Sequence, residues 1–123
     1  MSLLPSPDEL PWLPRPWEIL ETKPCEPVRL KVVRYEFGKI VIRPRYVGAP
    51  PEKVVVACRI HTTPEYKPVW PHYWDITPQR LVGALYTLLR AGIPPGMVLV
   101  IHRDMPGPAA HWSVRWEPEA SAR

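Results

Sequence analysis

One amphipathic helix, predicted over residues 78–91, limits the architectures that this chain can adopt. Thr77 can cap the free N–H groups of a first turn, and Pro78 suits the start of a helix because proline needs no N–H there. Apolar residues then recur at helical spacing, namely Leu81, Val82, Leu85, Leu88 and Leu89. Gly92 suits the positive-φ conformation that ends a helix, and Pro94-Pro95 prevents its continuation. The pattern predicts one helix with a single apolar face against a core.

Two apolar runs flank this helix, Lys53–His61 before it and Met97–Arg103 after it. Continuous β-branched runs are typical of parallel strands that are covered on both faces and joined by a crossover helix. We therefore expect these two strands to be parallel neighbours. A hairpin over residues 28–46, turning at Glu36-Phe37-Gly38, and a strand over 111–117 complete the prediction. The expected fold is α+β, a mixed five-stranded sheet with the helix on one face, in the order β-β-β-α-β-β.

The first 27 residues have the composition of an extended arm. Seven of the 19 prolines lie in this segment and exclude a sustained helix or central strand. Its leucines and tryptophans are too apolar for a free linker, so we expect the arm to cover the open sheet face or a neighbouring subunit. The predicted organisation is an arm over 1–27, one domain over 28–117 and a frayed tail over 118–123.

Composition indicates the growth temperature of the source, the cellular compartment and the state of the cysteines. The absence of asparagine, the single glutamine and the 19 prolines predict a thermophilic source, because amides are heat-labile and prolines stiffen loops. We expect a cytoplasmic protein, since no signal peptide or membrane-spanning run is recognisable. Two cysteines do not make a disulfide framework: Cys58 is predicted to be buried and Cys25 exposed, although a bridge between them remains open.

The predicted hairpin carries the strongest charge pattern. It holds six basic residues and one acidic residue, a net charge of +5, whereas the arm has five acidic and two basic residues, a net charge of −3. Cations on one sheet face beside aromatic rings are how many proteins bind RNA or single-stranded DNA. The candidate binding residues, including three from the aromatic loop 62–76, are Arg29, Lys31, Tyr35, Lys39, Arg43, Arg45, Tyr66, Trp70 and Trp74. A solvated basic surface, or one that binds the acidic arm, is the alternative interpretation.

Three histidines would share one edge of the sheet if the two flanking strands were parallel. Ligands collect outside the carboxyl ends of such strands, and a helix start nearby favours anions. His61-Thr62-Thr63 and His111-Trp112-Ser113 also share a His-x-Thr/Ser pattern, which resembles the paired motifs of two-histidine phosphoesterases. In that family one histidine acts as base and the other as acid. If the chain is an enzyme, the expected catalytic residues are His61, Thr63, His102, His111 and Ser113.

Three functions therefore follow from the sequence, in order of preference. The first is a non-enzymatic protein that binds RNA or single-stranded DNA through the basic hairpin. The second is a homo-oligomeric accessory protein, of the kind found in a mobile element or virus of a thermophile, joined through its acidic arm. The third is the histidine-edge phosphoesterase. No cofactor or metal is expected, because no glycine-rich phosphate loop or metal-ligand spacing is present.

Overall fold

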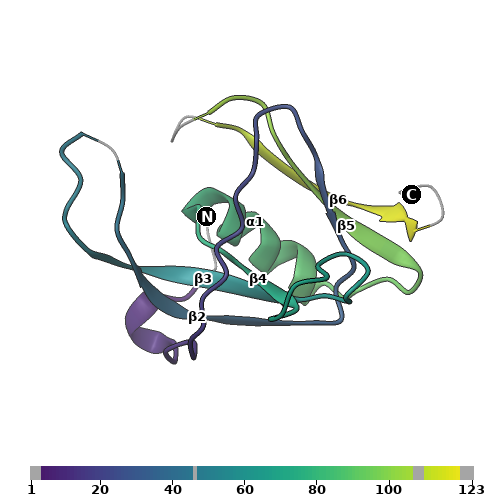
Figure 1. Cartoon of the computed structure of the whole chain (residues 1–123), viewed down its shortest axis with the longest axis horizontal. Coiled ribbons are helices and arrows are strands. Elements are labelled where there is room, and N and C mark those ends of the chain that lie inside the picture. Colours follow the sequence, from purple (N-terminus) through teal and green to yellow (C-terminus); the bar gives the residue numbers. More distant parts are fainter. Residues whose placement is uncertain (1–3, 46, 107–109, 120–123) are drawn as a thin grey trace.

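The computed structural model describes residues 4–45, 47–106 and 110–119, and these form six strands and one α-helix (Figure 1). A short 3-10 helix, η1 (Pro7–Glu9), precedes the first strand. The strands are β1 (Val28–Leu30), β2 (Arg34–Ile42), β3 (Lys53–His61), β4 (Tyr73–Ile76), β5 (Met97–Arg103) and β6 (Trp112–Pro118). Helix α1 (Gln79–Arg90) lies between β4 and β5 in the chain. The α+β class is confirmed.

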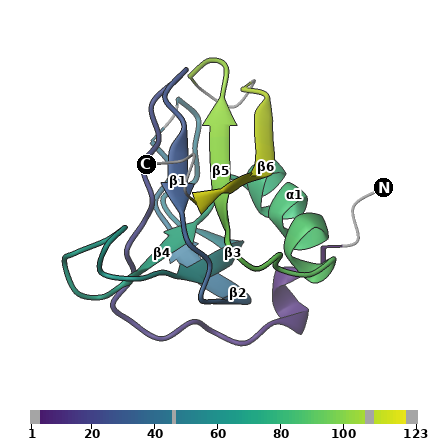
Figure 2. The same cartoon turned by 90° about the vertical axis from the view of Figure 1, so that its right-hand side faces the viewer.

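The strands form two antiparallel sheets, so the predicted single mixed sheet is wrong. One sheet has the order β2-β3-β4 and the other β1-β5-β6. Strands β3 and β5, which we expected to be parallel neighbours, belong to different sheets. Helix α1 lies between the sheets and contacts both β3 and β6, so it joins two sheets instead of crossing over one (Figures 1 and 2). Burial on both faces, the property that suggested parallel pairing, is here produced by the helix on one side of β3 and the arm on the other.

Residues 28–42 do not form the predicted hairpin. Strand β1 pairs with β5, and after a bend at residues 31–33 the chain continues into β2, which pairs with β3. One extended segment therefore passes from one sheet to the other, as strands do at the corners of two-sheet proteins. Gly38, predicted in a turn, lies in the middle of β2 opposite Ala57. A Cβ at Gly38 would come within 2.5 Å of Leu13 Cγ, so glycine is required here by the close approach of the arm.

Both sheets and the helix share one core. Leu81, Val82, Leu85 and Leu89 are the buried residues of α1, as the helical spacing predicted. The helix end is also as expected, because Gly92 has a φ of 116° and its N–H bonds to Leu89 O. The predicted cap is wrong, since Pro78 occupies the N-cap position and no side chain caps the helix. Gln79 instead donates to Val56 O on β3, which ties the first turn to the sheet.

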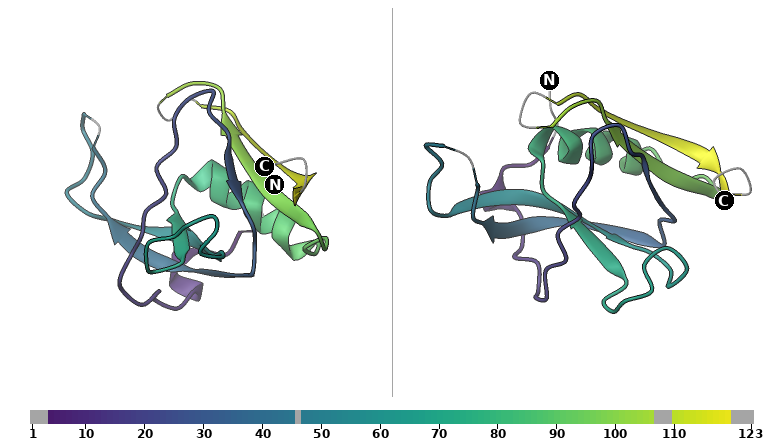
Figure 3. Two further views of the ribbon diagram at one scale, coloured as in Figure 1. Left: turned by 45° about the vertical axis from the view of Figure 1, so that its right-hand side comes forward. Right: turned by 45° about the horizontal axis from the view of Figure 1, so that its top comes forward.

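The arm lies across the face of the β2-β3-β4 sheet that the helix leaves open (Figure 3). It makes an isolated parallel bridge to each edge strand, Trp12 to Lys39 on β2 and Ile19 to Asp75 on β4. Between these bridges Leu13 is buried, and it packs with Ile40, Val55 and Ala57. The arm therefore covers its own chain. Of the predicted tail, only Pro118 and Glu119 lie within the described residues.

Candidate functional site

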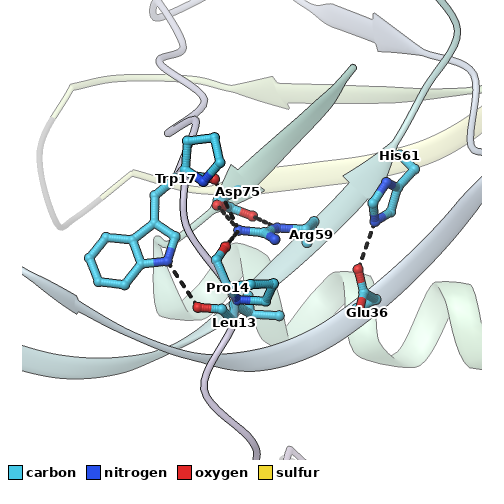
Figure 4. A network of polar contacts seen from close by, with 8 residues as sticks. Leu13, Pro14, Trp17, Glu36, Arg59, His61 and Asp75 are labelled. Atoms are coloured by element: carbon cyan, nitrogen blue, oxygen red, sulfur yellow. Dashed lines mark hydrogen bonds and ion pairs between the residues drawn. The ribbon is translucent and has the colours of Figure 1, made fainter. Parts of the chain in front are cut away.

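A buried arginine on the central strand β3 holds the arm against the sheet. Arg59 Nε and Nη2 donate to the two carboxylate oxygens of Asp75 at 2.7 and 2.9 Å. The same Nη2 donates to the backbone oxygens of Pro14 at 2.8 Å and Pro16 at 3.4 Å (Figure 4). Proline-rich backbone has carbonyl oxygens but few N–H groups, so a buried cation is a suitable partner for it. One side chain therefore connects the arm, β3 and β4.

Electrostatics make this contact tight. The Arg59 side chain is 3% exposed and that of Asp75 is fully buried. Burial acts to lower the pKa of the Arg59 guanidinium, but the hydrogen bond and charge of Asp75 outweigh it and raise that pKa. The guanidinium also lies 4.0 Å from the centre of the Tyr73 ring, whose own pKa is raised by burial. Both groups are charged, hydrogen-bonded to each other and buried away from solvent, so the role of this ion pair is to position the arm.

A second polar pair lies beside the first on the same face. His61 Nε2 is 2.7 Å from Glu36 Oε2, and the His61 ring is 5.4 Å from the Tyr73 ring (Figure 4 shows the histidine and the glutamate). A histidine held by a carboxylate has the arrangement of a general base or of a structural ion pair. His61 is also fixed through its backbone, since His61 O accepts the N–H of Val33 at the bend.

The predicted histidine edge is not assembled in this fold. His61 pairs with Arg34 at the start of β2, whereas His102 lies next to Ile101, the partner of Val28 at the start of β1. The two histidines are therefore at opposite ends of the segment that joins the sheets. His111 is exposed. Its backbone N–H donates to Asp104 Oδ1 at 2.8 Å and its Nδ1 lies 2.9 Å from Asp104 Oδ2, and these two contacts lower the pKa of the Asp104 carboxyl.

The partners of these histidines do not complete a catalytic set. Ser113 lies opposite His102 on β6, and the Thr63 hydroxyl is buried without a hydrogen-bond partner. Within the described ranges, no group of three or more His, Cys, Asp or Glu residues could hold a metal ion.

The predicted basic face is divided between the two sheets. Arg29 and Lys31 lie on or next to β1 and pair with Glu117 and Glu119 at 3.8 and 3.4 Å. Lys39 lies over the Trp12 ring of the arm at 4.8 Å. Tyr35 packs edge-on against Phe37 and the core. Arg29 and Lys31 therefore belong with the β1-β5-β6 sheet, whereas Tyr35 and Lys39 lie on β2, which leads directly to Arg43 and Arg45.

The aromatic loop is also divided between the core and the surface. Tyr66 and Trp74 pack against the main core, and Lys67 lies 4.7 Å from the Trp74 ring. Trp70 is 71% exposed, and so is its neighbour Val69. Trp70 is therefore the exposed ring among the three predicted for this loop.

Arg43 and Arg45 contribute instead to a groove between the arm and the end of β2. This arm groove has a volume of about 570 Å³ and is lined by Trp17, Ile19, Glu21, Val41, Ile42, Arg43, Pro44, Arg45 and Thr77. The Arg15 guanidinium lies 4.4 Å from the Trp17 ring, and Trp17 Nε1 donates to Leu13 O at 3.2 Å. The Arg43 side chain is 83% exposed and 3.8 Å from Glu52. An aromatic ring, aliphatic side chains and arginines therefore meet in one concave surface.

Sequence reasoning missed the pairing of Arg59 with Asp75, although each residue carries a visible signal. Arg59 is the charged residue inside the otherwise apolar run from Val54 to Ile60, and Asp75 follows two aromatic residues. A charge within a buried strand requires a partner, because burying it alone is very costly. The signal indicates that an ion pair exists but does not identify the arm carbonyls as additional partners.

No family model, curated protein or solved structure matches this chain. Within the described residues, α1 is too short and too polar to cross a membrane, and no other helix there could do so.

Proposed function

We propose that this protein binds single-stranded nucleic acid, RNA or DNA, in the arm groove. The observation that carries this proposal is the meeting of Trp17, Arg43 and Arg45 in one open groove, with Arg15 against the same tryptophan. Proteins that bind single strands combine aromatic stacking surfaces with cations that follow the backbone. The overall net charge of +4 favours a polyanionic partner.

The groove supplies both parts of such an interaction. Trp17 offers a ring for one unpaired base, and stacking of a base on an aromatic side chain contributes about 1–3 kcal/mol. Arg43 and Arg45 are available for phosphates, with Glu21 as the acidic residue in the lining. A duplex hides its bases in the stack, so a groove built around one ring favours single strands.

The salt dependence should be moderate. Two or three arginines at the groove correspond to a slope of about −1.4 to −2 in a plot of log K against log salt for a single strand. A steeper slope would require Arg29 and Lys31 as well, and these lie on or next to β1, in the sheet that does not carry the arm groove. The arm must stay in place for binding, because it contributes Trp17 and is held by Arg59.

Fluorescence anisotropy with a labelled ten-nucleotide strand tests the proposal. The variant Arg43→Ala/Arg45→Ala should weaken binding and flatten the salt slope, and Trp17→Leu should weaken binding about 5- to 150-fold, the equivalent of one stacked base. Arg80→Ala/Arg90→Ala, which removes the same charge from exposed positions on α1, serves as the matched control. Absence of binding at low salt, or an equal loss in the α1 control, would refute the proposal.

A further inference from the structure

One acidic residue lines the arm groove together with the two arginines. Glu21 is exposed, and its carboxylate makes no hydrogen bond or ion pair with any residue that the structure describes. Arg43 has its ion pair with Glu52 instead, at 3.8 Å. A free carboxylate repels the phosphates of a nucleic acid, so Glu21 acts against binding that depends on the phosphate backbone alone. A strand fits the groove best when Glu21 faces a group that is not a phosphate.

The charges of the groove come from two segments of the chain. The arm contributes Trp17, Ile19 and Glu21, which are alternate residues, and the end of β2 contributes Arg43 and Arg45. Alternate residues of an extended segment lie on one side of it. A single strand is therefore bound best with its phosphates toward β2 and its bases toward the arm. Four residues of extended chain span at most about 14 Å, so the base that Glu21 meets is a neighbour of the base stacked on Trp17.

A carboxylate distinguishes bases by the donors on their Watson–Crick edges, because it can only accept hydrogen bonds. Guanine presents two adjacent donors, N1–H and the N2 amino group, and these match the two oxygens of a carboxylate. Adenine and cytosine each present one amino group beside a ring nitrogen that accepts. Uracil and thymine present one N–H between two carbonyl oxygens. Acceptors repel the carboxylate, so guanine is the base that it binds best.

We propose that Glu21 makes the arm groove selective for guanine in a single strand. This inference rests on the proposed function and adds a base preference to the same groove. Trp17 does not supply such a preference, because its indole N–H already donates to Leu13 O and its ring stacks with any base. A good bidentate contact discriminates between bases by about 5- to 150-fold, and an exposed carboxylate belongs near the lower end of that range.

Fluorescence anisotropy with labelled ten-nucleotide RNA strands measures this preference. The strands consist of uridines with two adjacent purines at the centre, which are guanosines, adenosines or inosines. Adenosine is the reference, because it stacks on an aromatic ring as a purine but lacks the paired donors. The guanosine strand should bind about 5-fold more tightly than the adenosine strand. Inosine keeps N1–H and lacks the amino group, so its strand should lie between the two.

The variant Glu21→Gln tests whether the carboxylate is responsible. Glutamine keeps the shape of the side chain but offers one acceptor and one donor, so the guanosine strand should lose its advantage. The adenosine strand should bind as tightly as before or more tightly, because a repulsive charge is gone. A merely structural role of Glu21 would weaken both strands alike. Glu26→Gln is the matched control, since it removes the same charge from an exposed arm position outside the groove lining, and it should keep the preference.

Two results would overturn guanine selectivity while the groove remains a single-strand site. One is measurable binding of the guanosine and adenosine strands with equal affinity. The other is a guanosine preference that persists in Glu21→Gln. Absence of binding by every strand at low salt is a different result, because it removes the proposed function and this inference with it.

Discussion

Replacing Asp75 by asparagine tests the central interaction of this fold. The substitution keeps the shape of the side chain but removes the charge that compensates Arg59, whose side chain is 3% exposed. Removing one partner of a buried ion pair destabilises a protein by about 3–5 kcal/mol, because the other charge stays buried without compensation. Domains of this size have free energies of unfolding of about 5–15 kcal/mol. We therefore expect Asp75→Asn to lose a large part of the stability of the protein.

Urea unfolding followed by tryptophan fluorescence measures this loss. With a denaturant slope of about 1–3 kcal/mol/M, the midpoint should fall by roughly 1–5 M urea. A glutamate-specific protease should also cut the variant at Glu18 faster than the wild type, because Glu18 O accepts the N–H of Asp75 and the arm should loosen with it. Asp104→Asn, at an exposed carboxylate, is the control and should be nearly neutral in both assays. A fall in the free energy of unfolding of less than about 1 kcal/mol, as expected for an exposed ion pair, would show that Arg59 and Asp75 are not a buried pair and that the arm is not held by them.

Three further predictions follow from the structure. Gly38→Ala should destabilise the protein by about 1–3 kcal/mol in the same urea assay, because the new methyl group would overlap the Leu13 side chain of the arm. Iodoacetamide should modify Cys25 alone in the folded protein and both cysteines in urea, as counted by mass spectrometry. The reason is that Cys25 is exposed, whereas burial and the charge of Asp75 raise the pKa of the Cys58 thiol. The free energy of unfolding should fall as pH rises above about 10, because burial raises the pKa of Tyr73 and only the unfolded chain then loses the phenol proton. Between pH 8 and 11 the free energy of unfolding of Tyr73→Phe should fall less than that of the wild type, and an equal fall in both proteins would contradict this prediction.

The sequence predicts local elements well because their signals are local. The helix follows from the spacing of Leu81, Leu85 and Leu89, and its end follows from Gly92. Strands β3 and β5 follow from their β-branched runs, although these runs do not specify a pairing partner. Burial on both faces can come from a crossover helix or, as here, from a helix on one side and a proline-rich arm on the other.

The candidate site was predicted only in part, because its residues come together through long-range contacts. Arg43 and Arg45 were expected at a nucleic-acid surface and do line the arm groove, but Trp17 joins them only because the arm lies across the sheet. Gly38 was misread because a glycine that avoids a clash has the same sequence signal as a glycine in a turn. Whether the groove binds nucleic acid remains a prediction.

The position of the arm has a consequence for synthesis on the ribosome. The arm is made before its partners Lys39, Arg59 and Asp75, which follow about 25 to 60 residues later, and domains acquire structure as the chain emerges at roughly 5–20 residues per second. The nascent arm must therefore wait for several seconds without its binding surface. Until it closes, both edges of the β2-β3-β4 sheet are open to pairing with other chains. Loss of the arm should for this reason reduce the yield of soluble protein from cells more than the yield from dilute refolding.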